Sequence, residues 1–247
     1  AFQLWTTHDF APRAIGFTNI AYDHLDYFET YRDYVAAKKR LMQNAGEQTP
    51  GVFNAGDEWL RTWAAEFVGE TLLYGPSRPA VQGFDDALWF EEGRLMARFD
   101  GGEEVCWLED VTSLPFLGGH NLLNLMCAAG LAVDCGAELA ELGQAATSFE
   151  PLPHRLEYCG EIDDVAFFDD SKATNVNAAV AGMESLDGRL VPIVGGVDKD
   201  LELTDLLDKI GERAEHVVVI GDISERLTSE LEEQGFAASR IHAAESM

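Results

Sequence analysis

The C-terminal part of the sequence alternates short apolar runs with longer helical segments, and this alternation restricts the fold more than any other feature. The apolar runs VAFFD (165–169), LVPIV (190–194) and HVVVIGD (216–222) are each followed by a segment with helical spacing of apolar residues. Strands that alternate with helices are typical of a parallel sheet with helices on both faces. We therefore predict a doubly wound α/β domain whose ligand crevice lies at the carboxyl ends of the strands.

The segment FEPLPHRLE at residues 149–157 contains two prolines and interrupts this pattern. Proline and the residue before it favour turns or extended backbone over regular elements. We therefore place a domain boundary here and predict domains at 1–149 and 150–247. A chain of 247 residues is long enough for two domains.

The first domain also mixes strand-like and helix-like segments. Its strand-like runs are short and apolar, and the last two are consistent with a meander; they lie at 14–20, 51–57, 72–74, 87–90 and 105–108. Helical spacing is found over 31–45, over 58–68 and from about His120 onward. The whole chain is therefore predicted to belong to the α/β class.

Composition restricts the partners of the chain. Its 44 acidic and 17 basic residues give a formal net charge of −27, which repels nucleic acid and anionic membranes. No apolar run approaches the roughly 20 residues that a membrane-spanning helix needs. The four cysteines lack CxxC spacing and are typical of reduced core thiols in a cytoplasmic protein. We expect a cytoplasmic protein without nucleic-acid or membrane partners, and the acidic surface also fits solvation at high salt.

Lys38 lies in the middle of an apolar stripe on the helix predicted over 31–45, whose members are Tyr31, Tyr34, Val35, Leu41, Met42 and Ala45. One interpretation is that its stem covers apolar surface while the ammonium reaches water. The other is burial, which lowers the pKa of a lysine and yields a neutral amine. A neutral amine can form a Schiff base, act as a base, or capture CO₂ as a carbamate that binds Mg²⁺ through oxygen. The sequence alone leaves these possibilities open.

Two predicted strand ends in the second domain carry lysines. The loop DDSKATN (169–175) presents Lys172 at the start of a helix, where free N–H groups favour anions, and the loop GGVDKD (195–200) presents Lys199. Two such loops favour an anion site, to which Arg155 of the interdomain segment adds a guanidinium. The alternative is that Ser171 or Thr174 caps the helix while Lys172 is solvated.

Two further motifs are found in the first domain. DHLD (23–26) follows the first predicted strand and offers an imidazole between carboxylates, which suits either a magnesium site or a capped turn. Asn121 and Asn124 are three residues apart and share a helix face. Their amides could contact a purine edge or hold the preceding loop in place.

Several stretches occur together and in a fixed order: IGFTNIAYDHLDYFETYRDYVAAKKRLMQ, GVFNAGD, GGHNLLNLMCAAGLA, PLPHRLE, FFDDSKATNVNAAVAGMESL and IVGGVDKD. This set resembles the Mur ligase family over nearly the whole chain. The resemblance implies a partial central P-loop-type ATPase domain followed by a partial Rossmann-like C-terminal domain. Because no GxxxxGK[ST] phosphate loop occurs in the sequence, we expect a fragment that is inactive by itself.

The resemblance also implies an activity. It indicates an ATP- and Mg²⁺-dependent ligase of peptidoglycan precursor synthesis, which joins D-glutamate to UDP-N-acetylmuramoyl-L-alanine through an acyl phosphate. DSKATN together with PHR favours this member, since the folylpolyglutamate and diaminopimelate-adding relatives carry His where Lys172 stands. Another ligase of the family and a non-catalytic nucleotide-binding module are the alternatives. We expect a monomer.

Roles for individual residues follow from the same resemblance. His24 and Lys38 would serve one magnesium centre, with Lys38 carbamylated, and Lys172 would join them as a catalytic group. The remaining residues would contact substrates. Asn121 and Asn124 would line the adenine pocket, Arg155 would approach the ATP phosphates, and Asp170 would hold the nucleotide. Thr174 and Lys199, together with Lys172, would contact the D-glutamate and the phosphate.

Overall fold

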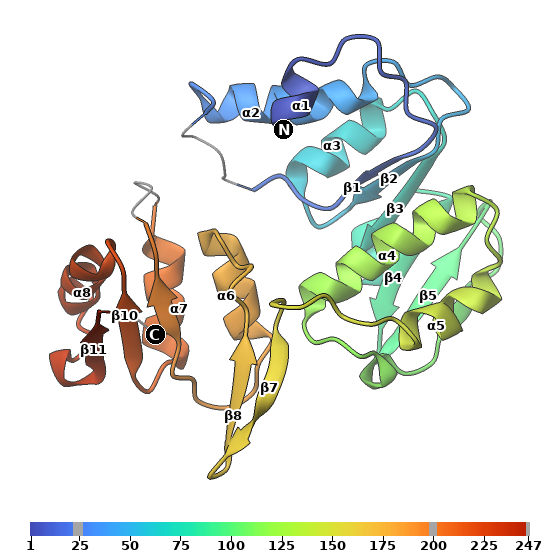
Figure 1. Ribbon diagram of the computed structural model, residues 1–247. Helices are drawn as coiled ribbons and strands as arrows, with labels where there is room; N and C mark the ends of the chain where they lie inside the picture. Colours follow the sequence, from blue (N-terminus) through green and yellow to red (C-terminus); the bar gives the residue numbers. More distant parts are fainter. Residues whose placement is uncertain (22–26, 198–201, 246–247) are drawn as a thin grey trace. The chain divides into compact units, whose positions relative to one another are not determined.

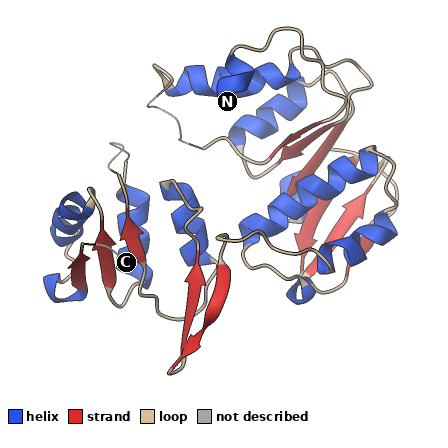
Figure 2. Cartoon of the chain, viewed as in Figure 1, coloured by secondary structure: helices blue, strands red, loops and turns tan. Residues whose placement is uncertain are grey.

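The computed structural model describes residues 1–21, 27–197 and 202–245 (Figure 1). The chain divides into two compact units, Ala1–Glu150 and Pro151–Met247, and each is considered by itself. Both units combine helices with parallel strands, so the predicted α/β class is confirmed (Figure 2). Within the described residues, no helix has the length and apolar character needed to cross a bilayer.

The first unit is built on one six-stranded sheet with the strands in sequence order: β1 (Ile15–Phe17), β2 (Gly51–Asn54), β3 (Thr71–Gly75), β4 (Asp86–Glu91), β5 (Arg94–Arg98) and β6 (Val105–Leu108). Strands β1 to β4 run parallel, whereas β4, β5 and β6 form an antiparallel meander. The meander was expected, but β5 was not among the predicted strands. The parallel strands place the carboxyl ends of β1, β2 and β3 at the same edge.

Helices cover both faces of this sheet (Figure 1). The helices of this unit are α1 (Phe2–Trp5), α2 (Tyr31–Lys39), α3 (Glu58–Glu66), α4 (Gly119–Asp134) and α5 (Leu139–Thr147), with 3₁₀ turns at Arg40–Met42, Arg78–Val81 and Val111–Ser113. Successive strand residues point to opposite faces, so Phe53 packs in the core under α2 and α3 while Val52 packs under α4 and α5. The two faces therefore have separate hydrophobic cores.

The helix predicted over 31–45 ends earlier than expected. It stops at Lys39 and continues as the 3₁₀ turn Arg40–Met42. Tightening of the last turn is common at helix C-termini because it satisfies carbonyl groups that lack α-helical partners. Leu41, Met42 and Ala45 still pack against the core, although they are only partly buried.

The second unit contains a three-stranded parallel sheet in the order β11 (Ile241–Ala244), β10 (Val217–Ile220) and β9 (Ile193–Gly195). Its helices are α6 (Val176–Glu184), α7 (Thr204–Arg213) and α8 (Ser224–Glu233), with a 3₁₀ turn at Ala238–Arg240. Their apolar side chains form a single core with the sheet, which includes Ile210, Val217 and Leu227.

The predicted strand VAFFD exists, but its expected pairing is wrong. It is β8 (Val165–Asp169), which pairs antiparallel with β7 (Glu157–Ile162) in a hairpin that is not hydrogen-bonded to the parallel sheet in the described part of the chain. The two-residue turn consists of Asp163 and Asp164, both with positive φ, as a type I′ turn requires. This turn reverses the direction of the chain, so β7 lies beside β8 as its antiparallel partner.

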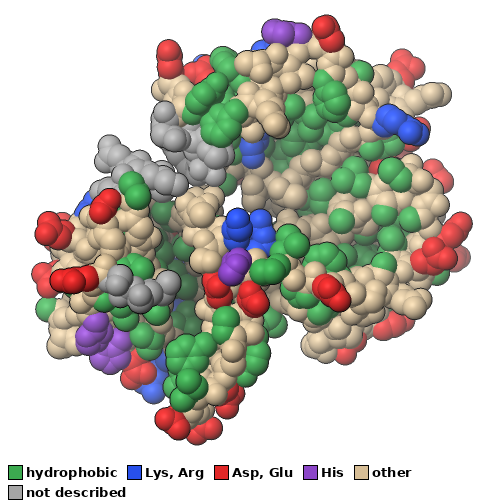
Figure 3. Space-filling model, viewed as in Figure 1, with side chains coloured by type: hydrophobic (Ala, Val, Ile, Leu, Met, Phe, Trp, Pro, Cys, Tyr) green, Lys and Arg blue, Asp and Glu red, His purple; other side chains and the backbone are tan. Residues whose placement is uncertain are grey.

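All four cysteines are free thiols, but only Cys127 is buried in a core. Cys106 is half-buried, and burial raises the pKa of both of these thiols. Cys135 at the end of α4 and Cys159 in β7 are exposed, which differs from the expected core positions. Acidic side chains are spread over the visible surface of both units, in keeping with the net charge (Figure 3).

Candidate active site

Lys38 lies in the last turn of α2 and is half-buried. Its ammonium donates to the carbonyl oxygen of Asn19 at 3.3 Å and lies 4.9 Å from the centre of the Tyr34 ring. The stem therefore covers apolar surface while the Nζ atom lies beside the chain that leaves β1. Lys39, the next residue, points elsewhere and pairs with Glu66 at 2.6 Å.

The segment that follows β1 is fixed by side chains from several elements. Asp57 accepts a hydrogen bond from the Ile20 N–H at 2.6 Å, and Asn54 donates to the carbonyl of Thr18 at 2.8 Å. The Tyr74 hydroxyl donates to the carbonyl of Phe17 at 2.8 Å, and burial raises the pKa of this phenol far above its usual range. These hydrogen bonds connect the carboxyl ends of β1, β2 and β3 at one edge of the sheet, next to Lys38.

The structural roles of Asn54, Asp57 and Tyr74 were not predicted from the sequence. Asn54 is the buried polar residue of the described chain, and it stands in the otherwise apolar strand GVFN. A buried amide needs hydrogen-bond partners, so this position was a usable signal in the sequence. The proposed magnesium ligand His24 and the proposed substrate contact Lys199 both lie outside the described residues.

Asn121 and Asn124 lie in the first turns of α4, which begins after Gly118. Gly118 has a φ of 94°, a conformation that favours glycine, and this explains the glycine-rich turn before the helix. The half-buried amide of Asn121 donates to the carbonyl of Leu117 at 2.8 Å and so holds the preceding loop. The amide of Asn124 is exposed and lies 3.5 Å from the Asn121 carbonyl oxygen.

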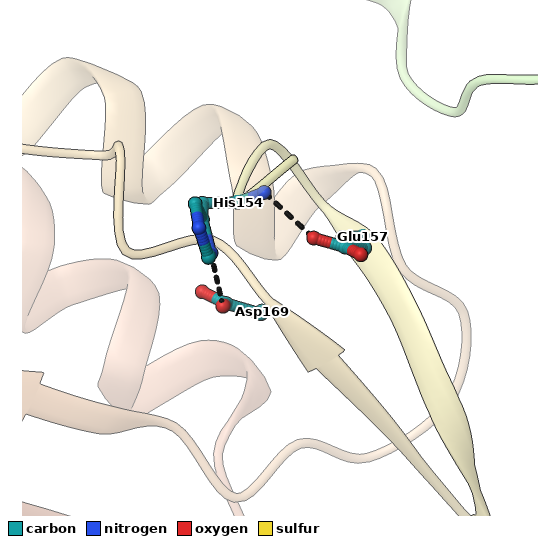
Figure 4. A group of neighbouring side chains, drawn as sticks. All are labelled: His154, Glu157 and Asp169. Atoms are coloured by element: carbon teal, nitrogen blue, oxygen red, sulfur yellow. Dashed lines mark hydrogen bonds and ion pairs between the residues drawn. The ribbon is translucent and has the colours of Figure 1, made fainter. Parts of the chain in front are cut away.

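The second unit brings the PHRLE turn and the DDSKATN loop together (Figure 4). The His154 Nδ1 atom lies 2.7 Å from an Asp169 carboxylate oxygen, and the Leu156 N–H donates to Asp170 at 3.0 Å. Hydrogen bonds from His154 and Ser171 lower the pKa of Asp169 to about 2. Arg155 and Lys172 are therefore presented by two loops that contact each other.

The four candidate residues of this unit that the structure describes differ in exposure. Asp170 is half-buried, and Gly182 provides the space for its carboxylate, because a Cβ at that position would lie 2.5 Å from an Asp170 oxygen. Arg155, Lys172 and Thr174 are exposed. The alternative in which Ser171 or Thr174 caps the next helix is wrong, since Asn175 caps α6 by accepting the Ala178 N–H at 2.9 Å.

Polar side chains at the carboxyl ends of β1, β2 and β3 stand where open α/β sheets bind their ligands, and the second unit presents Arg155 and Lys172 on two loops that contact each other. The chain belongs to the Mur ligase family: residues 4–132 match the family described as Mur ligase middle domain, and residues 154–247 match the Mur ligase, glutamate ligase domain. The resemblance that the sequence indicated is thereby confirmed.

Similar proteins include the UDP-N-acetylmuramoylalanine--D-glutamate ligases of Geotalea uraniireducens and Methylobacillus flagellatus. The first is 32% identical over 94% of this chain and 49% of its own length, and the second is 36% identical over 95% and 50%. Among solved structures, MurF from Acinetobacter baumannii aligns with a TM-score of 0.69 at 19% identity, over 95% of this chain and 51% of that one. The chain therefore spans about half the length of the curated relatives it matches.

Proposed function

We propose that this chain forms part of an ATP-dependent ligase that joins D-glutamate to UDP-N-acetylmuramoyl-L-alanine in cytoplasmic peptidoglycan precursor synthesis. The observation that carries the proposal is the similarity to ligases with this named activity along 94–95% of the chain. Residues 1–149 would be the partial ATPase domain and residues 150–247 the partial C-terminal domain. Mg²⁺, ATP and the two substrates are part of this proposal.

The position of Lys38 supports its assignment to the metal centre. A half-buried amine at the carboxyl edge of β1, in contact with the Asn19 carbonyl, stands where an α/β enzyme binds its ligands. As a carbamate, this side chain would offer oxygen ligands, which Mg²⁺ prefers, and His24 would add an imidazole. Bound Mg²⁺ would neutralise charge on the phosphates during carboxylate activation.

The loops of the second unit would serve the remaining charges. ATP would transfer its γ-phosphoryl group to the substrate carboxylate, and the amine of D-glutamate would then displace phosphate from the acyl phosphate. Arg155 and Lys172 would bind phosphate oxygens, and Asp170 would hold the nucleotide. Thr174 and Lys199 would contact D-glutamate, while Asn121 and Asn124 would line the adenine site.

The proposal is tested by an assay of phosphate release and peptide product with the complete gene product. D-Glutamate should support product formation, whereas L-alanine, L-glutamate and diaminopimelate should not. Product from one of those amino acids alone would assign the chain to another ligase of the family. ATP binding without product from any of them would favour a non-catalytic nucleotide-binding module.

The role of Lys38 is tested separately. Lys38→Ala should nearly abolish ligation, whereas Lys39→Ala, which removes the neighbouring surface ion pair with Glu66, should leave it intact. Carbon-13 NMR after addition of labelled bicarbonate should show a carbamate signal that Lys38→Ala removes. Wild-type activity in Lys38→Ala would disprove the metal-centre assignment.

A further inference from the structure

Three hydrogen bonds join the PHRLE turn to the loop that follows β8. The Lys172 N–H donates to the His154 carbonyl at 3.1 Å, the His154 imidazole lies 2.7 Å from Asp169, and the Leu156 N–H donates to Asp170 at 3.0 Å. Asp169 also accepts the Ser171 N–H at 2.9 Å through its other oxygen. Its carboxylate is therefore bonded both to the turn that carries Arg155 and to the loop that carries Lys172.

The backbone on both sides of Arg155 adopts a conformation that non-glycine residues seldom occupy. His154 has a φ of 65° and Leu156 a φ of 49°. Such conformations persist where surrounding interactions hold them. In this turn the His154 N–H donates to Glu157 at 2.8 Å, and the imidazole is held by Asp169 (Figure 4). The direction in which Arg155 leaves the turn therefore depends on these bonds.

The two basic side chains that these loops carry are exposed. Among the described residues, neither the Arg155 guanidinium nor the Lys172 ammonium forms an ion pair, although the chain has 44 acidic residues and 17 basic ones. The hydrogen bond between the His154 carbonyl and the Lys172 N–H places the two backbones beside each other. The arrangement leaves both cations available to a common anion.

We propose that Asp169 and His154 are positioning residues, which lock the two loops together so that Arg155 and Lys172 bind the phosphate groups of the nucleotide as a preset pair. The proposal rests on the proposed function for the identity of the anion. Asp169 is suited to this task because it stays ionised through the pH range of any enzyme assay. Pre-organisation of this kind lowers the cost of ordering flexible basic side chains on binding.

The locking itself is tested on this chain by amide hydrogen exchange. Asp169→Ala should accelerate exchange at the Lys172 and Leu156 amides by about tenfold. Asp169→Asn should keep protection, because its amide oxygen can accept the Ser171 N–H while its NH₂ group donates to the imidazole. Glu161→Ala, which removes an exposed carboxylate from the same hairpin, is the matched control. Unchanged exchange in Asp169→Ala would overturn the proposal.

The functional consequence is tested in the complete gene product. Asp169→Ala should raise the KM for ATP about tenfold with a smaller effect on the KM for D-glutamate, and Asp169→Asn should restore the value for ATP. Normal ATP kinetics in an active Asp169→Ala enzyme would overturn the positioning role. A wild-type enzyme without ligase activity would instead refute the proposed function, while the exchange result would still report on the locking.

A metal site is the competing explanation. One imidazole nitrogen and two carboxylate oxygens from His154, Glu157 and Asp169 lie within 4.8 Å of one another. We expect that titration of the chain with Mn²⁺ or Zn²⁺ reveals no metal binding that depends on Asp169. Stoichiometric binding that is lost in Asp169→Ala would overturn the proposal.

Discussion

One carboxylate oxygen of Asp57 accepts the backbone N–H of Ile20 at 2.6 Å, across 37 residues of sequence, while the other caps α3 at the Leu60 N–H. Asp57 therefore connects the chain that leaves β1 to the start of a helix. Asp57→Ala should lower the free energy of unfolding by about 2 kcal/mol, because both a helix cap and a long-range hydrogen bond are lost.

Urea denaturation of the chain measures this effect. Glu58→Ala is the matched control, since it removes an exposed acidic residue from the same helical turn. The control should change stability by less than about 0.5 kcal/mol. Equal losses in the two variants would show that neither the helix cap nor the bond to Ile20 contributes to stability.

Loss of the proton from Asp134 should lower the free energy of unfolding of the chain as the pH rises. Partial burial, together with the negative charges of Glu70 and Asp86, raises the pKa of Asp134 from 3.8 to about 6 in the folded chain. The folded chain therefore holds this proton more tightly than the unfolded chain, so stability falls as the pH rises between these two values. Asp134→Asn should stabilise the chain at pH 7 by about 1 kcal/mol, a figure reduced for the exposure of the side chain to water.

The measurement is the urea midpoint as a function of pH. Asp134→Asn should remove the decline between about pH 4 and pH 6, while Glu103→Gln, a change at an exposed carboxylate of the same unit, should leave it in place. A wild-type curve that is flat or rising across this window would contradict the assignment.

Potassium chloride should stabilise the chain. At a net charge of −27, the negative side chains of the folded chain repel one another and lower its stability. Added salt screens this repulsion, because the screening length falls from about 8 Å at 0.15 M to about 3 Å at 1 M. The urea midpoint should therefore rise over that range of KCl, and it should rise less in Asp134→Asn, which lacks one of the repelling charges. A midpoint that stays constant or falls would exclude the high-salt interpretation of the composition.

Gly195 at the end of β9 should tolerate no side chain. A Cβ at this position would overlap the backbone carbonyl of Ile220 on the neighbouring strand. Gly195→Ala should therefore lower stability by about 3 kcal/mol or more. Gly211→Ala is the control: nothing lies within 4 Å of a Cβ there, and alanine in helix α7 should raise stability by about 0.5–1 kcal/mol. The midpoint temperature of thermal unfolding should fall in Gly195→Ala and rise in Gly211→Ala.

The fold was predictable where the pattern of apolar residues is local. After residue 190, the spacing of apolar residues predicted β10 and its flanking helices, because each of these segments buries an apolar face in the core. The hairpin of β7 and β8 was not predictable in the same way, since its turn is Asp163-Asp164 rather than a glycine-containing pair.

The site was predictable only in part, for a physical reason. The helical stripe identified Lys38 as an unusual lysine, but this side chain, in the last turn of α2, is half-buried rather than enclosed. The hydrogen bonds of Asp57 and Tyr74 to the chain around β1 join residues far apart in sequence, so no local pattern reports them. The functional roles of all the candidate residues stay predictions, and His24 and Lys199 also lie outside the described residues.

The distribution of cysteines gives each unit one accessible thiol. Cys135 and Cys159 are exposed, whereas burial raises the pKa of Cys106 and Cys127 and so reduces their reactive thiolate form. A maleimide dye pair would therefore attach at one point in each unit without any engineered residue. Energy transfer between the two dyes would then follow the separation of the units in solution.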